Sequence, residues 1–203
     1  IPGTRRALQG AMEIAEVESD AGSMHHEDVV GEEVYEEMAH EIRKLCVWAV
    51  MPDDGASGRV DNFPGSQPVS LSRSNMELLK REPYSVTWKA DGTRYLLMLM
   101  RDGTYLIDRK FAIRRVQMRF PLPHKKFGTN VHHCTLMDGE MVVDTDPQTK
   151  KQTRRYLAYD LMAINGERVT QRPFLERLNI VREFVVEPRK AFLAQAGPSG
   201  AYA

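Results

Sequence analysis

Residues 88–95 read Trp-Lys-Ala-Asp-Gly-Thr-Arg-Tyr, which places a lysine beside an acid, a glycine and an arginine at fixed offsets. A lysine is mostly protonated near neutral pH, and it attacks phosphorus only when burial or neighbouring cations depress its pKa. Arg94 is one such cation, while Gly92 permits a tight turn or a close approach of the backbone to a phosphate. From these residues alone, Lys89 is either a nucleophile or a surface lysine beside an Asp-Gly hairpin turn.

The residues on either side of this motif favour β-strands. Residues 84–89 have the pattern of a half-buried strand, and residues 95–100 form a second, very apolar one. The lysine would then lie where a strand meets a turn, and rigid elements on both sides would aim its side chain. Asp102-Gly103 follows between two apolar runs, so residues 94–100 and 104–109 are expected to pair as an antiparallel hairpin.

The remaining elements follow from spacing and from turn residues. A second antiparallel pair is expected from residues 134–144 and 154–164, followed by a turn at Asn165-Gly166. Because antiparallel strands predominate, the expected class is α+β.

Three helices are expected around these strands. The first spans residues 33–50, because apolar residues recur there at steps of three and four, namely Tyr35, Met38, Ile42, Leu45 and Ala49. After a loop over residues 51–72, Ser74 and Glu77 have the spacing of a capping box that opens a short helix through residue 79. Pro173 lies near the start of a third helix, which reaches about residue 186 and is stopped by Pro188.

Four segments together resemble one family. Residues 89–95 are similar to the nucleotidyl-lysine motif of mRNA capping guanylyltransferases, which belong to the covalent nucleotidyltransferase superfamily with the DNA and RNA ligases. Residues 63–70, Phe-Pro-Gly-Ser-Gln-Pro-Val-Ser, resemble the segment that precedes the lysine in animal capping enzymes, and this segment favours a capping enzyme over a ligase. Residues 136–142 and 156–160 resemble the family's second acidic motif and its aromatic strand. The order and spacing of these motifs match over about residues 62–190.

This resemblance implies an antiparallel-sheet-rich nucleotidyltransferase domain of the ATP-grasp or ligase-like type. Three later motifs of the family are not found in the sequence: a strand similar to Asp-Gly-Leu-Ile-Phe, a lysine-rich strand, and a motif of the OB-fold domain that closes over the nucleotide. We therefore expect an incomplete domain over residues 32–190, preceded by an acidic, weakly ordered arm over residues 1–31. A low-complexity tail is expected over residues 191–203.

The resemblance also implies the reaction and its basic residues. Lys89 would attack the α-phosphate of GTP to form a lysyl-N–GMP intermediate, and the GMP would then pass to the 5′-diphosphate end of RNA. Arg94 would contact the nucleotide, since a planar guanidinium suits ribose or phosphate oxygens. Arg109 matches an arginine that reaches the ribose, and strand alternation would place it on the same face as Ile107.

Two acids and an aromatic residue complete the implied site. Asp138 and Glu140 are two residues apart on an expected strand, so they face the same way, toward the nucleotide and its Mg²⁺ or Mn²⁺. Glu140 is the stronger candidate for the metal. Tyr159 matches the aromatic residue that stacks on guanine, and Tyr156 is the alternative for that position.

The composition limits the class of protein. The 203 residues are 42% hydrophobic and carry no net charge, yet the charges are segregated along the chain. Residues 7–42 hold eleven acids and no Lys or Arg, whereas residues 101–126 hold eight basic residues and two acids. Such a basic stripe favours polyphosphate or RNA, although it is also typical of a solvated sheet face. There is no secretory signal pattern, no run long enough to span a bilayer and no disulfide framework, since only two cysteines occur. The implied location is the nucleus, with no membrane partner.

Two other groups of residues are weaker candidates for a site. His132-His133-Cys134 lacks the further ligands of a zinc site and the arginine of a phosphatase loop, and His25-His26 is better interpreted as part of a polar arm. Two alternative functions remain open at this point. One is an ATP-dependent polynucleotide ligase, and the other is a non-catalytic module that binds the phosphorylated tail of RNA polymerase II.

Overall fold

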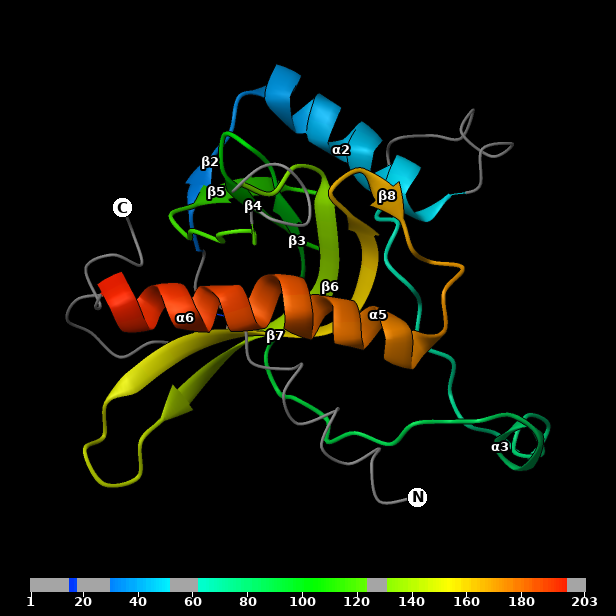
Figure 1. Cartoon of the computed structure of the whole chain (residues 1–203). Coiled ribbons are helices and arrows are strands. Elements are labelled where there is room, and N and C mark those ends of the chain that lie inside the picture. The colour runs from blue at the N-terminus through cyan, green and yellow to red at the C-terminus, as the bar shows by residue number, and fades with distance from the viewer. Residues whose placement is uncertain (1–14, 18–29, 52–61, 124–130, 197–203) are drawn as a thin grey trace.

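The computed structural model describes residues 15–17, 30–51, 62–123 and 131–196, and an antiparallel sheet forms its centre (Figure 1). Within these residues the sheet has eight strands in the order β1-β7-β6-β3-β4-β5-β2, with β8 paired to β7. The strands are β1 (Ala15–Val17), β2 (Glu32–Glu33), β3 (Thr93–Leu99), β4 (Thr104–Ile107), β5 (Ile113–Val116), β6 (Thr135–Thr145), β7 (Gln152–Ile164) and β8 (Glu167–Arg168). The expected α+β class is confirmed.

Both predicted hairpins are present. β3 pairs with β4 through the turn at Asp102-Gly103, and Leu97 lies opposite Leu106. β6 and β7 form the longest pair, and their far end projects from the body as a two-stranded arm (Figure 1). Residues 96–99 of β3 and all four residues of β4 are buried, so both faces of the β3–β4 hairpin lie in the core. A slip by one residue would move every side chain to the opposite face, where it would meet different packing partners.

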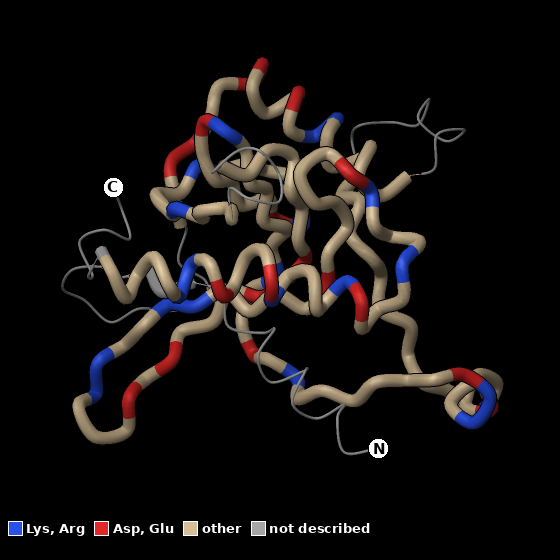
Figure 2. The backbone as a smooth tube through the Cα atoms, in the orientation of Figure 1, with Lys and Arg blue, Asp and Glu red and all other residues tan. Residues whose placement is uncertain are grey.

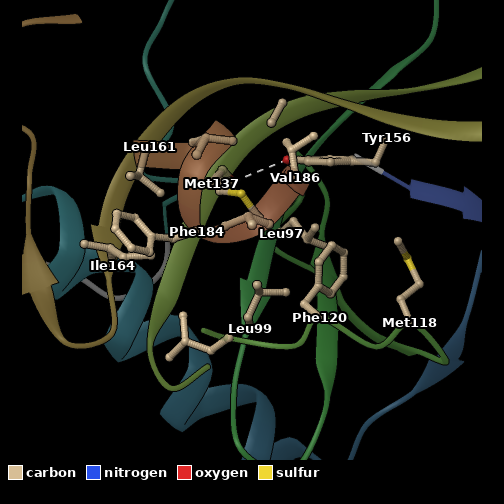
Figure 3. Close-up of a cluster of buried hydrophobic side chains, with 14 of the residues drawn as sticks. Leu97, Leu99, Met118, Phe120, Met137, Tyr156, Leu161, Ile164, Phe184 and Val186 are labelled. Carbon is tan, nitrogen blue, oxygen red and sulfur yellow. Dashed lines mark hydrogen bonds between the residues drawn. The ribbon is translucent and has the colours of Figure 1, made fainter. Parts of the chain in front are cut away.

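Helices cover the two faces of the sheet. β3 shows the division, since Leu96 and Met98 pack with helix α2 (Glu36–Val50), whereas Leu97 and Leu99 lie in the cluster on the opposite face. That second cluster, drawn in Figure 3, is closed by α5 (Phe174–Val181) and by the π-helical segment η2 (Arg182–Val186), which continues into α6 (Glu187–Ala196). The sheet is thus a central layer with helical cover on both sides.

The first helix differs from its prediction in its start and its buried face. α2 begins at Glu36 with Tyr35 as the N-cap residue, and Tyr35 and Met38 are exposed. The residues that pack on the sheet are Ala39, Ile42, Cys46, Val47 and Ala49. The period of the helix was correct, but its apolar face is rotated from the one that we predicted.

Residues 84–89, which we predicted as a strand, form no strand. Tyr84, Val86 and Trp88 are exposed, and none of the described strands pairs with this segment. A strand forms only where a neighbour satisfies its backbone N–H and C=O groups, so a β-type sequence pattern alone was insufficient. In Figure 1 the segment returns toward the body from α3 (Leu78–Arg81), which lies away from the sheet.

The predicted capping box of α3 is also wrong. Glu77 is the N-cap residue without a side-chain cap, and its carboxylate pairs with Lys80 at 2.8 Å. Asn75 organises the preceding turn instead, because its side-chain oxygen accepts a hydrogen bond of 2.7 Å from the backbone N–H of Ser72.

Pro188 does not stop the last helix. The chain remains helical through it to Ala196, beyond the boundary that we expected at residue 190. Proline has no N–H with which to bond the carbonyl four residues earlier, which here belongs to Phe184. That oxygen lies 3.2 Å from Nε2 of the buried His132, and the π-helical turn η2 lies just before the proline.

The expected acidic arm falls largely on residues 1–14 and 18–29, which lie outside the described residues, and so does His25-His26. Between them, β1 pairs with β7. Residues 197–203 of the expected tail are also outside the described part of the chain.

Candidate active site

A cavity of about 580 Å³ brings together all six of the predicted site residues. They come from the irregular segment before β3, from β3 itself, from the β4–β5 turn and from β6 and β7, and they are Lys89, Arg94, Arg109, Asp138, Glu140 and Tyr159. Its volume is in the range of cavities that hold a small organic ligand. A second cavity of about 520 Å³ lies at the β3–β4 turn and includes none of these residues.

An ion pair between β3 and β6 forms one wall. Arg94 Nε donates to Asp138 Oδ1 at 2.9 Å, and Arg94 Nη2 donates to Asp138 Oδ2 at 2.5 Å. The side chains of Arg94 and Asp138 are only 9% and 3% exposed. The hydrogen bond to the carboxylate raises the pKa of Arg94 above its usual value, so the guanidinium stays charged. Asp91, the nearest acid in sequence, is not the ion-pair partner of Arg94.

Tyr159 lies beside this ion pair, whereas the alternative aromatic, Tyr156, lies in the core. Burial, followed by the charge of Asp138, raises the pKa of Tyr159 well above its usual value, so the phenol remains neutral. Tyr156 is fully buried, and its hydroxyl donates to the carbonyl of Tyr95 at 2.9 Å. The carbonyl of Met137 lies 3.3 Å from the same hydroxyl (Figure 3). Of the two aromatic rings, only that of Tyr159 lines the cavity.

Glu140 holds the turn of the lysine motif. Its Oε1 accepts a hydrogen bond of 2.9 Å from the backbone N–H of Gly92. A β-carbon at Gly92 would lie 2.2 Å from the carbonyl oxygen of Met141, so only glycine permits this approach between the turn and β6.

Of the two predicted acids, Glu140 is the one with a carboxylate oxygen that could contact a hard divalent cation. Mg²⁺ is commonly bound by one or two carboxylates together with substrate phosphates and water. Glu140 uses Oε1 for Gly92, which leaves Oε2 for such an ion or its water. Asp138 has both oxygens engaged by Arg94. Among the described residues there is no cluster of three His, Cys, Asp or Glu side chains, so substrate oxygens would have to supply the other ligands.

Lys89 and Arg109 reach the cavity from segments without regular structure. The side chain of Lys89 is exposed, and Nζ donates to the carbonyl of Ala90 at 3.3 Å. Arg109 lies in the β4–β5 turn, so the predicted strand alternation with Ile107 was wrong. Asp108 shapes that turn by accepting hydrogen bonds from the backbone N–H groups of Lys110 and Ala112 at 2.8 and 2.9 Å.

Two further parts of the cavity wall were not predicted as site residues. One part consists of Phe174, at the start of α5, and Asp160 of β7. The guanidinium of Arg177 lies over the Phe174 ring and donates two hydrogen bonds, of 2.7 and 2.9 Å, to the Asp160 carboxylate. Residues 66–68 also line the cavity. The resemblance of residues 63–70 to capping enzymes predicts no site role for residues 66–68. No sequence pattern connects Asp160 with an arginine seventeen positions later.

His132 and Cys134 are buried away from this cavity. His132 Nδ1 lies 3.1 Å from Thr135 Oγ1, and its other nitrogen faces the Phe184 carbonyl. Burial lowers the pKa of His132 to about 4 and raises the pKa of the Cys134 thiol to about 11, so both groups are neutral near pH 7. In the described part of the chain, every helix is too short or too polar to cross a bilayer.

Comparison with known proteins gives one consistent family. Residues 24–199 match the model described as the mRNA capping enzyme, catalytic domain. The chain is 40% identical over 143 residues to the mRNA-capping enzyme subunit alpha of Neurospora crassa and 40% identical over 136 residues to that of Schizosaccharomyces pombe. It is 37% identical over 129 residues to the mRNA-capping enzyme of Danio rerio.

These alignments cover about two thirds of the chain but a smaller part of each relative. They include 66%, 63% and 63% of this chain and 35%, 34% and 21% of the three relatives, respectively. The chain therefore spans about a third or less of the length of these relatives.

Proposed function

Because this chain belongs to the mRNA capping enzyme catalytic-domain family, we propose that it is the part of an RNA guanylyltransferase that carries the nucleophile, Lys89, and much of the GTP-binding site. In this proposal, the α+β fold described above is the first part of a ligase-like nucleotidyltransferase domain. A polynucleotide ligase charged with AMP is the less favoured alternative, since the three relatives above are all named as capping enzymes.

The observation that carries the proposal is the convergence of the six side chains on one cavity. Lys89 and Glu140 are 51 positions apart, and Tyr159 is 19 positions further on, yet all three line it. A nucleophile, two guanidinium groups, two carboxylates and an aromatic ring suit a nucleoside triphosphate. Guanidinium groups match phosphate and ribose oxygens, and the ring offers a surface on which a base can stack.

The proposed chemistry consists of two displacements at one phosphorus atom. Lys89 Nζ, after losing a proton, attacks the α-phosphorus of GTP, so that a P–N bond forms and the P–O bond to the β-phosphate breaks with release of pyrophosphate. An oxygen of the RNA 5′-diphosphate then attacks the same phosphorus, so that a P–O bond forms and the P–N bond breaks. The lysine is regenerated, and GMP is joined to the RNA.

The other residues bind and orient the nucleotide in this proposal. Arg94 and Arg109 hold ribose or phosphate oxygens, and Tyr159 stacks on the guanine. Glu140 fixes the turn after Lys89 through Gly92 and holds the divalent cation through its second oxygen. A bound Mg²⁺ or Mn²⁺ would supply positive charge against the phosphates.

Partners and location follow from the same proposal. The 5′ end of nascent RNA is the acceptor, and the nucleus is the location where this chemistry is needed. Docking on the phosphorylated tail of RNA polymerase II is a further proposed interaction, which is consistent with the basic side chains of residues 101–126.

We propose further that the chain by itself transfers little GMP. Phosphoryl transfer depends on cations that neutralise the leaving group, and the lysine-rich and OB-fold motifs of the family are not found in the sequence. Loss of one charged contact in such a site costs about a hundredfold in rate, so loss of several would silence the reaction.

The test is mass spectrometry after incubation with GTP and Mg²⁺, with a search for a GMP adduct on the tryptic peptide that contains Lys89. The chain is assayed alone and after fusion to the C-terminal remainder of the Danio rerio relative. We expect an adduct only in the fusion and only with GTP, since the ligase alternative requires ATP.

Two variants serve as controls in the fusion. Lys89→Ala and Lys89→Arg should both lack the adduct, because the arginine side chain stays protonated and cannot attack. An adduct of wild-type yield in Lys89→Ala would refute the assignment of the nucleophile. Strong labelling of the unfused chain would refute the need for the later motifs.

A further inference from the structure

Phe63 lies against the guanidinium of Arg94. The centre of its ring is 5.3 Å from Arg94 Cζ, within the range of a cation–π contact. The ring of Phe63 also packs with that of Phe111, whose centre is 6.4 Å away at an interplanar angle of 79°, in an edge-on arrangement. Phe63 is partly buried against the core cluster under α2, so its position is set by the body of the protein.

Gly65, in the same segment as Phe63, lies close to both the Phe63 ring and the Arg94 guanidinium. A β-carbon at this position would lie 2.3 Å from Phe63 Cε1 and 2.8 Å from Arg94 Nη2. Any other residue would therefore push the ring and the guanidinium apart. Phe63, Gly65 and Arg94 thus form one packed unit, although Arg94 lies 31 positions after Phe63.

Two protein groups therefore contact the Arg94 guanidinium. Asp138 engages the edge formed by Nε and Nη2, and Phe63 lies against the group. In the described part of the chain Nη1 makes no hydrogen bond, and Arg94 lines the cavity. Nη1 is therefore the nitrogen left for a ligand in the cavity, and the aromatic contact restricts rotation of the group about the Asp138 carboxylate.

From this geometry we propose that Phe63 is a positioning residue, which acts through Arg94 to aim its free N–H groups at the nucleotide. Gly65 contributes to this positioning, because the absence of a side chain allows the Phe63 ring to contact the Arg94 guanidinium. The inference rests on the proposed role of Arg94 in nucleotide binding. It also gives a physical role to the segment that precedes the lysine motif, beyond its resemblance to capping enzymes.

The first measurement concerns the Arg94 side chain itself and needs no activity. In the ¹⁵N-labelled chain, the Nε–Hε signal of Arg94 should be shifted by the ring current of Phe63. We expect Phe63→Leu to move this signal and Phe63→Tyr, which keeps the ring, to leave it near its original position. Phe192→Leu is the matched control, since it removes another aromatic ring that lies 5.5 Å from a different arginine, Arg119.

The second measurement is GTP affinity by calorimetric titration with Mg²⁺ present. Phe63→Leu should weaken binding about three- to tenfold, because the Arg94 side chain would then have to be ordered when the nucleotide binds. Phe63→Tyr should bind within about twofold of the wild type, as should Phe192→Leu. In an Arg94→Lys background, Phe63→Leu should have almost no further effect, because the group that it positions is gone.

The outcomes distinguish this inference from the proposed function. If Phe63→Leu weakens GTP binding equally with and without Arg94, the ring acts by general packing and the inference fails. It also fails if GTP binds equally well to Phe63→Leu and to the wild type, while the proposed function stands. If the wild-type chain binds no GTP although the Arg94 signal responds to Phe63→Leu, the proposed function fails and only the side-chain contact remains.

Discussion

Glu140 and Gly92 are joined by a hydrogen bond of 2.9 Å, which ties the acidic strand β6 to the turn that follows Lys89. The same carboxylate would therefore serve both the geometry of the lysine motif and the divalent cation. Substitution can separate the two roles. Glu140→Gln keeps a side-chain oxygen that can accept from Gly92 but removes the negative charge, and Glu140→Ala removes both.

We expect Glu140→Gln to preserve slow hydrogen exchange of the Gly92 amide, whereas Glu140→Ala should accelerate it at least tenfold. Both variants should lose GMP labelling in the fused chain described above. Amide exchange followed by NMR is the measurement, with the Lys110 amide, bonded to Asp108, as an internal reference. Rapid exchange at Gly92 in the wild type would show that this bond does not hold the turn in solution.

The ion pair between Arg94 and Asp138 predicts a large effect on stability. Asp138→Ala leaves a guanidinium of 9% exposure without its partner, and an uncompensated buried charge of this kind costs about 3 kcal/mol or more. The free energy of unfolding from urea titration measures the loss. Glu77→Ala is the matched control, because it breaks an exposed pair with Lys80 and should change stability by less than about 1 kcal/mol. Equal effects of the two substitutions would contradict the buried character of the first pair.

The main hairpins were predictable because local sequence determines them. Asp102-Gly103 and Asn165-Gly166 mark turns, and continuous apolar runs mark the strands on either side of the first. β5 was missed, because it has four residues and two of them are arginines. The prediction of a strand at residues 84–89 was wrong for the opposite reason, since these residues have the pattern of a strand but no partner among the described strands.

The composition of the site was also predictable, whereas its internal contacts were not. The motifs identified the six residues, and the fold places all six around one cavity. That Asp138 pairs with Arg94, and Glu140 with Gly92, depends on the register of β3 against β6, which places Arg94 opposite Glu140. The long separation in sequence between these partners hides such contacts from any local pattern.

The segment from residue 66 to residue 88 predicts self-association of the chain. Val69 and Val86 are 85% and 89% exposed, and several other apolar side chains of this segment are exposed as well. Exposed apolar side chains that gather on one segment favour association with another chain. We expect Val69→Lys and Val86→Lys, combined, to reduce light scattering and binding of the dye ANS without lowering the thermal midpoint.

Ala191→Lys on α6 is the control for added charge, because it also places a lysine on an exposed position but outside this segment. It should leave scattering close to the wild-type level. If Ala191→Lys reduces association as strongly as the double variant, net charge rather than the exposed segment is the cause.

His132 predicts how stability depends on pH. Burial holds its pKa at about 4 in the folded chain, below the usual value of 6.5, so folding favours the neutral imidazole. The stabilisation is fully present above about pH 6.5 and is lost as the pH falls toward 4, where the unfolded chain binds the proton first. By pH 4.5 the loss from this group should reach roughly 2 kcal/mol. His132→Gln can still donate to the Phe184 carbonyl but cannot titrate, so its unfolding free energy should fall less between pH 7 and 4.5. Urea titration of both proteins at the two pH values gives the comparison, and parallel losses would mean that His132 is not the group responsible.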